Sequence, residues 1–393
     1  MNIQPRPEAE NEPVPYVYVH APFCARRCVY CDFAVDVSRQ GDLPGWLGAL
    51  EGELALVEGK GQISLASSLK TLYVGGGTPS ILGPESMVGL GKVLGVHRLT
   101  EPDLEWTAEA NPESFTLHVA KAWRRAGVNR VSLGVQSFQE GPLSWMGRLH
   151  GAEGGRGAVS RARAAGFRNL SVDLIFGLPP SVNRDWRYDL ERALALEVPH
   201  LSLYGLTVEP RTPFGQAVEA GRELPVDDAR YGDEFLLACE RLSSAGYIQY
   251  ELSNFALAGF ESRHNQACWA LRPYLGLGNA AHSFRHPLRK WNLRDWAEYQ
   301  TAVREGKDPT EGWEKLDGES MRLEAIWLGL RARWGVALQS LSSQGLALVE
   351  EWEEQGWAEL LPGAIRMTPT GWLLLDRLAV DLASVEEEAR PSP

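Results

Sequence analysis

Short apolar runs rich in β-branched residues alternate with longer stretches of helical periodicity through the first two thirds of the chain. The short runs predict strands at 14–20, 69–74, 104–110, 130–136, 170–176 and 200–206. The stretches between them predict helices at 44–58, 84–95, 115–126, 152–165 and 184–196. Six strands that alternate with helices favour a parallel sheet with crossover helices, either open or closed into a barrel.

Chemically reactive residues gather directly after the predicted strands. The segments concerned read CARRCVYC, GGGTP, EANP, QSF, DLIFGLP and LYGLTVEP. In a parallel barrel the carboxyl ends of the strands converge on one mouth, and active sites are built there. The pattern therefore favours a full or partial barrel with a functional site at that mouth.

The pattern changes after about residue 300, where GKDPTEGWEKLDG is rich in turn-forming and charged residues. We predict a barrel domain at 14–300, after a disordered leader at 1–13, and a smaller, mostly α-helical, winged-helix-like domain at 301–393. The helix of this domain that would read DNA carries a run of carboxylates, which repel phosphates. They are Glu350, Glu351, Glu353 and Glu354. A packing or lid role is favoured over DNA binding.

Composition narrows the classes of function. The 393 residues are 44% hydrophobic, which is enough for a large core and a second domain. A net charge of -12 argues against nucleic acid as a partner. The longest apolar runs are too short to cross a bilayer, and the polar leader lacks the features of a signal peptide. Five cysteines, three of them crowded together, favour the reducing cytoplasm over a disulfide framework.

Cys24, Cys28 and Cys31 form a CxxxCxxC group. Thiolates are soft ligands that suit zinc or iron–sulfur clusters. Structural zinc usually takes four ligands, often as two separated pairs, and the chain has no second pair, although His20 could complete a Cys3His site. Three cysteines also fit a four-iron cluster with one open iron, which can bind a substrate. Buried cysteines without a metal are the third alternative.

The CxxxCxxC spacing after a first strand resembles the signature of radical S-adenosylmethionine (SAM) enzymes. The longer YVHAPFCARRCVYCDF resembles the oxygen-independent coproporphyrinogen oxidase group, and the likeness extends over essentially the whole chain. The resemblance implies an α/β fold with a partial (β/α)6 barrel. It also implies a [4Fe–4S] cluster on Cys24, Cys28 and Cys31, with SAM chelated to the open iron and cleaved to a radical on reduction.

The same resemblance implies a set of SAM contacts. Gly76, Gly77 and Thr78 would meet the amino group of SAM, and Tyr18 and Tyr30 would pack near it. The remaining contacts would be Glu109, Gln136, Arg148 and Asp173. From the residues alone, GGGTP could be an ordinary turn, Gln136 and Arg148 could be surface or capping residues, and Tyr18 would be assigned to the core. An acidic Asp173 inside an apolar strand requires a polar partner.

Two activities occur in this group, and three features favour one of them. Phe33 stands where the oxidase carries a fourth cysteine, the leader is short, and HNQACW resembles the HNxxYW motif of the HemW haem chaperones, with Cys268 in place of tyrosine. This resemblance implies haem as cargo and His264 as a candidate iron ligand. Without the motif, a surface or hydrogen-bonded histidine would be the better interpretation of His264.

The chaperone resemblance further implies respiratory haem proteins as clients, an electron donor for the cluster, and no coproporphyrinogen oxidase activity. It does not decide whether the protein forms a homodimer or contacts the membrane at its surface. Two alternatives remain: an anaerobic coproporphyrinogen III dehydrogenase, and a zinc-stabilised interaction module without radical chemistry.

Overall fold

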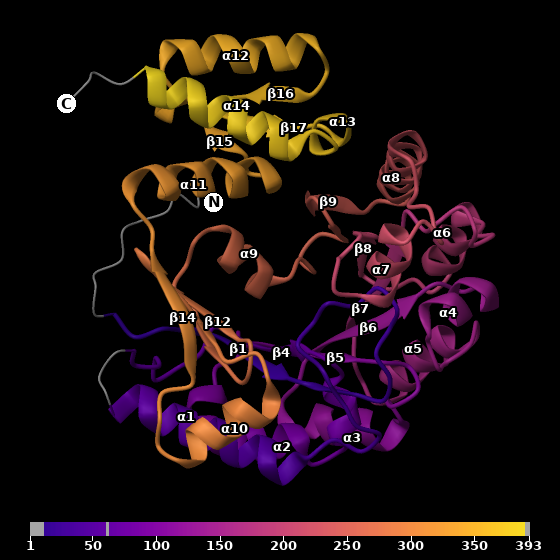
Figure 1. Ribbon diagram of the computed structural model, residues 1–393, viewed down its shortest axis with the longest axis vertical. Coiled ribbons are helices and arrows are strands. Elements are labelled where there is room, and N and C mark those ends of the chain that lie inside the picture. The colour runs from indigo at the N-terminus through magenta and orange to yellow at the C-terminus, as the bar shows by residue number, and fades with distance from the viewer. Residues whose placement is uncertain (1–11, 60–62, 390–393) are drawn as a thin grey trace.

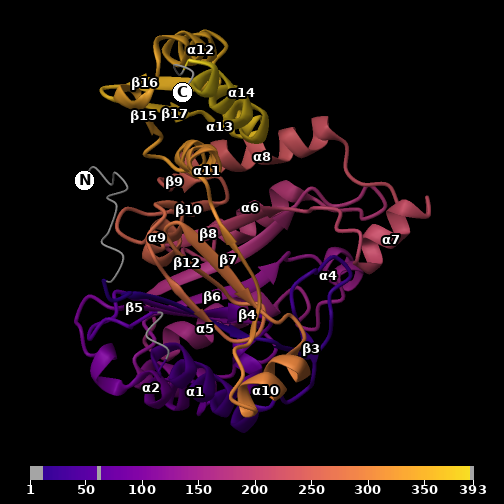
Figure 2. The ribbon, with the colours of Figure 1, turned by 60° about the vertical axis from the view of Figure 1, so that its left-hand side comes forward.

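The computed structural model describes residues 12–59 and 63–389. The predicted leader at 1–13 lies almost entirely outside the described residues. The chain forms a curved sheet wrapped by helices, with a smaller unit stacked on one side of it (Figures 1 and 2). None of the helices in the described ranges is long and apolar enough to span a membrane.

The main sheet contains all six predicted strands side by side, paired parallel in chain order. They are β1 (Tyr16–Ala21), β4 (Thr71–Gly76), β5 (Glu105–Ala110), β6 (Arg130–Gln136), β7 (Asn169–Phe176) and β8 (His200–Gly205). Short strands extend both edges: β11 (Leu275–Leu277) pairs parallel with β1, β10 (Asn254–Ala256) pairs antiparallel with β8, and β9 (Ile248–Glu251) pairs antiparallel with β10. In the described residues the two edges do not pair with each other, so the sheet is a partial barrel.

The five predicted crossover helices are confirmed. They are α1 (Leu43–Gly59), α2 (Ser86–Leu94), α3 (Leu117–Ala126), α5 (Gly154–Ala164) and α6 (Trp186–Leu194), joined by the short α4 (Glu140–Met146), α7 (Pro213–Glu219) and the longer α8 (Asp228–Ser244). The five crossover helices cover the outer face of the sheet (Figure 1). Strand residues that face them, such as Val17, Leu72 and Leu133, are fully buried.

The inner face of the sheet is polar because side chains alternate along each strand. In β5, Trp106 and Ala108 pack outward, while Glu105 and Glu109 point inward. Buried polar groups need hydrogen-bond partners. The inward residues of neighbouring strands therefore bond to one another, as Ser132 of β6 does to Asp173 of β7.

Two of the smaller sheets lie close to the main sheet in the chain, and a third belongs to the C-terminal unit. The first is antiparallel and consists of β12 (His282–Arg285), β13 (Leu288–Asn292) and β14 (Thr310–Lys315), with α10 (Trp296–Arg304) between β13 and β14. The loop after β1 holds a short parallel pair, β2 (Phe23–Cys24) and β3 (Asp36–Val37). The helix α9 (Arg263–Trp269) packs against β4 inside the curve of the sheet.

The C-terminal unit combines helices with a small antiparallel sheet of three strands. Its elements are α11 (Gly318–Arg331), β15 (Val336–Ala337), α12 (Ser343–Glu354), β16 (Ala358–Leu361), β17 (Ala364–Met367), α13 (Pro369–Trp372) and α14 (Leu375–Glu388). The three strands pair in the order β15-β17-β16. It joins the edge of the main sheet through hydrogen bonds from Leu252 to Arg331 and from Arg333 to Tyr250. The predicted domain boundary after residue 300 falls inside α10, and the division into domains stays a prediction.

Candidate functional site

A cavity of about 560 Å³ opens at the carboxyl ends of the parallel strands. The cysteine loop, the glycine segment after β4 and the ends of β5 to β8 form its walls. Most of the predicted site residues line it: Cys24, Cys28, Tyr30, Cys31, Gly76, Gly77, Thr78, Glu109, Gln136, Arg148 and Asp173. Segments that are far apart in sequence meet here because parallel strands bring their carboxyl ends to one edge.

The three cysteines lie in a loop that is tied to its neighbours. Thr78 Oγ1 lies 3.3 Å from Cys24 Sγ, and Arg148 Nη1 donates a hydrogen bond to Cys28 Sγ over 3.8 Å. The Cys31 amide donates to the Cys28 carbonyl at 3.2 Å, which closes a turn between them. All three sulfurs therefore belong to one wall of the cavity, and a guanidinium approaches one of them.

Burial raises the pKa of the Cys24 thiol to about 11 and also raises that of Cys31. Thiols in such a loop keep their protons until a metal displaces them. Across residues 12–59 and 63–389, no three His, Cys, Asp or Glu side chains converge on a point that would hold a single metal ion. A four-iron cluster does not require that convergence, because each thiolate binds a different iron.

His20 was the candidate fourth ligand of a zinc site. Both of its ring nitrogens are engaged, with Nδ1 at 3.1 Å from the Tyr18 hydroxyl and Nε2 at 2.9 Å from the Ala34 carbonyl oxygen. Burial lowers the pKa of the ring to about 4, so it is neutral. The ring braces the cysteine loop instead of lining the cavity, and this arrangement does not support a Cys3His zinc site.

The glycine segment after β4 approaches the cysteine loop more closely than other residues could. Gly76 has a φ of +108°, and a Cβ there would lie 2.4 Å from the His20 ring. A Cβ on Gly77 would lie 2.8 Å from the backbone of Pro22 and Phe23. Glycine is therefore required at both positions, and the segment is more than an ordinary turn.

Glu109 ends β5 and points into the cavity. Its Oε1 accepts a hydrogen bond of 2.7 Å from the Tyr73 hydroxyl, and its Oε2 accepts one of 3.1 Å from the Gly76 amide. Burial, and secondarily the nearby Asp173, raise the pKa of this carboxyl group to about 7. The group is therefore close to half protonated at neutral pH, and a cation in the cavity would favour its charged form.

Asp173 has the partners that its place in an apolar strand requires. The Ser132 hydroxyl lies 2.9 Å and 3.1 Å from its two carboxylate oxygens, and the Ser171 hydroxyl donates at 3.2 Å. Burial raises the pKa of Asp173, against the effect of these hydrogen bonds. The two carboxyl groups, Asp173 and Glu109, give the inner wall an acidic character.

Gln136 and Arg148 lie together over Gly134 of β6, where a Cβ would come within 3.1 Å of the Gln136 amide and 3.4 Å of the Arg148 guanidinium. Gln136 adopts a φ of +69° where the pairing of β6 with β7 shifts register, so the strand end is bent. Its buried Oε1 has no hydrogen-bond partner among the described residues. Arg148 donates from Nη2 to Asn111 Oδ1 at 2.7 Å. The unpaired amide oxygen is an acceptor that a polar ligand in the cavity can satisfy.

The structure separates the two predicted tyrosines. Tyr30 lines the cavity beside Cys28 and Arg148. Tyr18 does not line it: its ring stacks on Tyr73, with centroids 6.2 Å apart, one layer deeper inside the barrel. Tyr18 therefore reaches the cavity only through Tyr73, whose hydroxyl bonds Glu109.

His264 lies on α9 and does not line the cavity. Its side chain is buried, its Nδ1 is 2.7 Å from Thr71 Oγ1, and its ring packs on Tyr73 at a centroid distance of 5.2 Å. Burial lowers the pKa of the ring to about 3. The structure thus shows a hydrogen-bonded interior histidine, and ligation of haem iron stays a prediction for this residue.

Sequence reasoning missed several residues of the cavity wall, including Asn111, Ser132 and Tyr204. Two signals could have found the first two. Asn111 belongs to the EANP segment directly after β5, and Ser132 is two positions before Gly134 on the inner face of β6. The period of two along each strand therefore extends the site beyond the residues that the resemblance names.

Comparisons with known proteins agree with this geometry. A model of the radical SAM superfamily matches residues 18–193. Heme chaperone HemW of Bacillus subtilis is 34% identical over 370 residues, which cover 91% of this chain and 96% of that protein. The chain belongs to the HemW family of radical-SAM proteins. Heme chaperone HemW of Mycobacterium tuberculosis H37Rv is 35% identical, with 92% of each chain covered.

A solved structure gives the fold of this HemW-family protein independently. Coproporphyrinogen III oxidase (HemN) from Escherichia coli, described as a radical SAM enzyme, superposes with a TM-score of 0.76. The match covers 97% of this chain and 92% of the other at 22% sequence identity. The likeness extends through the C-terminal unit, and at this identity it concerns the fold alone.

Proposed function

We propose that this protein is a haem chaperone that carries a [4Fe–4S] cluster on Cys24, Cys28 and Cys31, binds SAM, and delivers haem to respiratory haem proteins. The observation that carries the proposal is that one cavity gathers three cysteines, a close-approach glycine segment and an acidic wall. Membership of the HemW family supports haem as the cargo. The cytoplasm, an electron donor and respiratory clients belong to the same proposal.

The residues of the cavity fit a cluster and SAM. When bound and reduced, the cluster would supply an electron to SAM. Gly76, Gly77 and Thr78 line the cavity and would meet the amino group, Glu109 would face it as a carboxylate, and the unpaired Gln136 Oε1 would accept a hydrogen bond. The proposed SAM contacts also include Arg148, Asp173 and Tyr30, which line the cavity. Tyr18 would act indirectly, because its ring packs on Tyr73.

Phe33 supports a chaperone over an oxidase. It stands at the position of the fourth cysteine of the oxidase, and its side chain is 63% exposed beside the cavity. The phenyl ring of Phe33 has no donor atom that could ligate iron. His264 stays the proposed haem ligand of the HNQACW segment, and α9 would have to move to present its buried ring.

Affinity for SAM is expected to depend on pH through Glu109. The folded protein holds this carboxyl at a pKa of about 7, above its ordinary value, so the empty site favours the protonated form and binding of an ammonium group requires loss of that proton. Below about pH 7 affinity should fall up to about tenfold per pH unit. Calorimetry of the reconstituted protein measures it, with cluster absorbance recorded at each pH.

Glu109→Gln is the matched control for this titration. The amide keeps the shape of the side chain but cannot ionise, so we expect weaker binding with a flat pH profile. A wild-type profile as flat as that of the variant would contradict the role of Glu109.

Haem delivery is tested with a respiratory haem protein produced in haem-depleted cells. We expect the haem-loaded, cluster-reconstituted chaperone to restore the haem spectrum and the activity of this acceptor under anaerobic conditions. Albumin loaded with the same amount of haem serves as the control donor, because it binds haem without a specific client. Equal recovery of acceptor activity with both donors, or no recovery with the chaperone, would contradict the proposed delivery of haem.

A further inference from the structure

The small sheet of β12, β13 and β14 ends in a free strand edge. β14 (Thr310–Lys315) is its outer strand, and no strand of the described residues pairs with the other edge of β14. The opposite side of this sheet is tied to the chain before β11 by a bridge between Tyr274 and Phe284. A free edge presents backbone N–H and C=O groups that can pair with another strand. β14 runs along the outside of the molecule, so a second strand can reach it (Figure 1).

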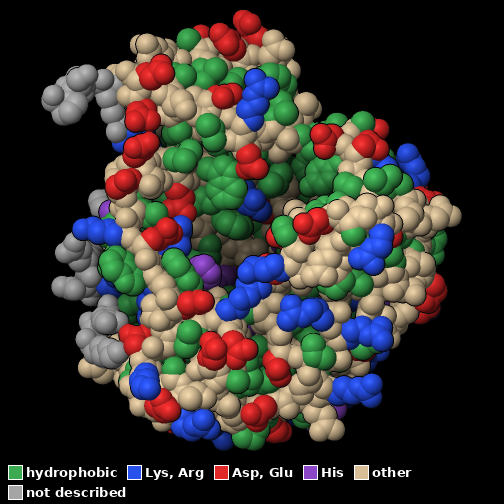
Figure 3. Space-filling view, in the orientation of Figure 1, with side chains coloured by type: hydrophobic (Ala, Val, Ile, Leu, Met, Phe, Trp, Pro, Cys, Tyr) green, Lys and Arg blue, Asp and Glu red, His purple; other side chains and the backbone are tan. Residues whose placement is uncertain are grey.

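β14 lacks most of the features that protect an edge strand. Such strands are commonly very short, contain proline or are covered by a loop. β14 has six residues and no proline. Its Trp313 is 68% exposed, more than any other aromatic residue of the described chain, and Leu288 on the adjacent β13 is 49% exposed. The space-filling view shows hydrophobic side chains among charged ones where β14 runs (Figure 3).

Two charged residues flank Trp313 on the same face of β14. Glu311, Trp313 and Lys315 share this face because side chains alternate along a strand, and all three are exposed. Neither the Glu311 nor the Lys315 side chain has an ion-pair partner among the described residues. Glu314, on the opposite face, is already paired with Arg289 at 3.0 Å. Glu311 and Lys315 are therefore the charges of β14 that are free to meet another molecule.

The sequence of β14 is complementary to itself in one antiparallel register. When the twofold axis passes through Trp313, the two copies of Trp313 face each other, and Glu311 of each copy faces Lys315 of the other. Opposite charges and aromatic pairs directly across an antiparallel pair are stabilising. A shift by one residue either sets Glu311 against Glu314 of the other copy or separates Glu311 from Lys315. It also turns the two tryptophans to opposite faces.

We propose that two copies of this protein pair through β14, with Trp313 at the twofold axis. The two small sheets then form one continuous antiparallel sheet. Because both copies use the same surface, the contact closes on itself and ends at a dimer. We expect the dimer to be weak and dependent on concentration, because one strand pair is smaller than the standard interface of about 1,200–2,000 Å². The inference is independent of the proposed haem-chaperone function.

Sedimentation equilibrium of the full-length protein over a dilution series tests the pairing, since it measures the dissociation constant of a dimer. Lys315→Glu and Glu311→Lys each create two like-charge pairs across the axis, so each should raise this constant about tenfold. The double variant, Glu311→Lys with Lys315→Glu, restores opposite charges in exchanged positions. It should dimerise as the wild type does.

Three further variants complete the series. Trp313→Ser removes the aromatic pair at the axis and should also raise the dissociation constant. Arg377→Glu and Val380→Ser are the controls, because they make comparable changes at exposed positions of α14, far from β14 in the chain. Both controls should dimerise as the wild type does. Thermal melting of each variant checks that the fold is kept.

The proposal has clear contrary results. A single-chain particle at every concentration of the wild type would overturn it. A dimer that Lys315→Glu, Glu311→Lys and Trp313→Ser leave unchanged would also overturn it, because that dimer would use another surface. Failure of the double variant to recover the wild-type dissociation constant would overturn the register. None of these results concerns haem binding, which the haemin titration tests separately.

Discussion

Cys28→Ser is expected to abolish cluster assembly. The proposed cluster has three protein ligands, and a hydroxyl is a hard, weakly acidic ligand that does not replace a soft thiolate. Arg148 would also lose the sulfur to which it donates. After anaerobic reconstitution, iron and acid-labile sulfide in the variant should fall to the level of a protein without the cysteine group.

Cys268→Ser is the matched control for this experiment. Cys268 lies on α9, outside the cavity, so the variant should assemble the same iron and sulfide as the wild type. A full four-iron spectrum in Cys28→Ser would refute the ligand assignment. One zinc per chain with no iron in the wild type would instead support the zinc-stabilised module.

Asp189→Ala is expected to cause the largest loss of stability among single substitutions near the site. Asp189 and Arg184 form a fully buried ion pair at 2.8 Å, and Asp189 also accepts hydrogen bonds of 2.8 Å from Ser137 and Phe138. Removal of the carboxylate leaves a buried guanidinium and two donors unpaired, which costs about 3–5 kcal/mol. Denaturation with guanidinium chloride measures the free energy of unfolding.

The same substitution should also damage the cavity. Ser137 directly follows Gln136 at the end of β6, and Arg184 donates to the carbonyl of Ile175, which lines the cavity. Asp185→Ala, on the same helix, removes only an N-cap bond of 3.0 Å to the Tyr188 amide and should cost about 1 kcal/mol. A loss for Asp189→Ala no larger than that of Asp185→Ala would contradict this account of the ion pair.

The sequence predicted the parallel core of the fold correctly because its strands are long, apolar on the helix-facing side and separated by amphipathic helices. All six strands and five helices appear within about two residues of their predicted limits at most ends. The region between residues 206 and 300 was not predicted in this detail. Its strands β9 to β12 are three or four residues long, too short for a period to show.

The sequence predicts the site residues that directly follow a strand. It does not predict how deep inside the barrel a side chain lies. The cysteines, the glycine segment and Glu109 follow strands, so convergence at the mouth follows from the topology. Tyr18 and His264 were expected near bound groups, yet both pack around Tyr73 in the interior. The layer that a side chain occupies inside a barrel depends on strand stagger, which a single sequence does not reveal.

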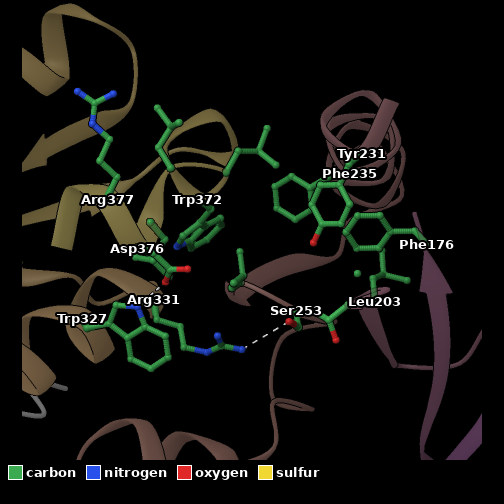
Figure 4. Close-up of a pocket in the computed structure, with 16 residues that line it drawn as sticks. Phe176, Leu203, Tyr231, Phe235, Ser253, Trp327, Arg331, Trp372, Asp376 and Arg377 are labelled. Carbon is green, nitrogen blue, oxygen red and sulfur yellow. Dashed lines mark hydrogen bonds between the residues drawn. The ribbon is translucent and has the colours of Figure 1, made fainter. Parts of the chain in front are cut away.

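A cavity of about 520 Å³ beside the C-terminal unit could not be predicted from the sequence, because its lining comes from β7, α8 and that unit, which are far apart in the chain. Trp327 and Trp372 of the C-terminal unit line one side of this cavity (Figure 4). The packing or lid role of the unit stays a prediction.

The central claim is that this protein carries haem, and the most direct test is the anaerobic haemin titration of the cluster-reconstituted wild-type protein, followed in the Soret region. We predict saturable binding of one haem per chain, with a spectrum distinct from free haemin. A Soret change that rises linearly with haemin and never saturates would contradict the account and make coproporphyrinogen turnover the activity to measure next.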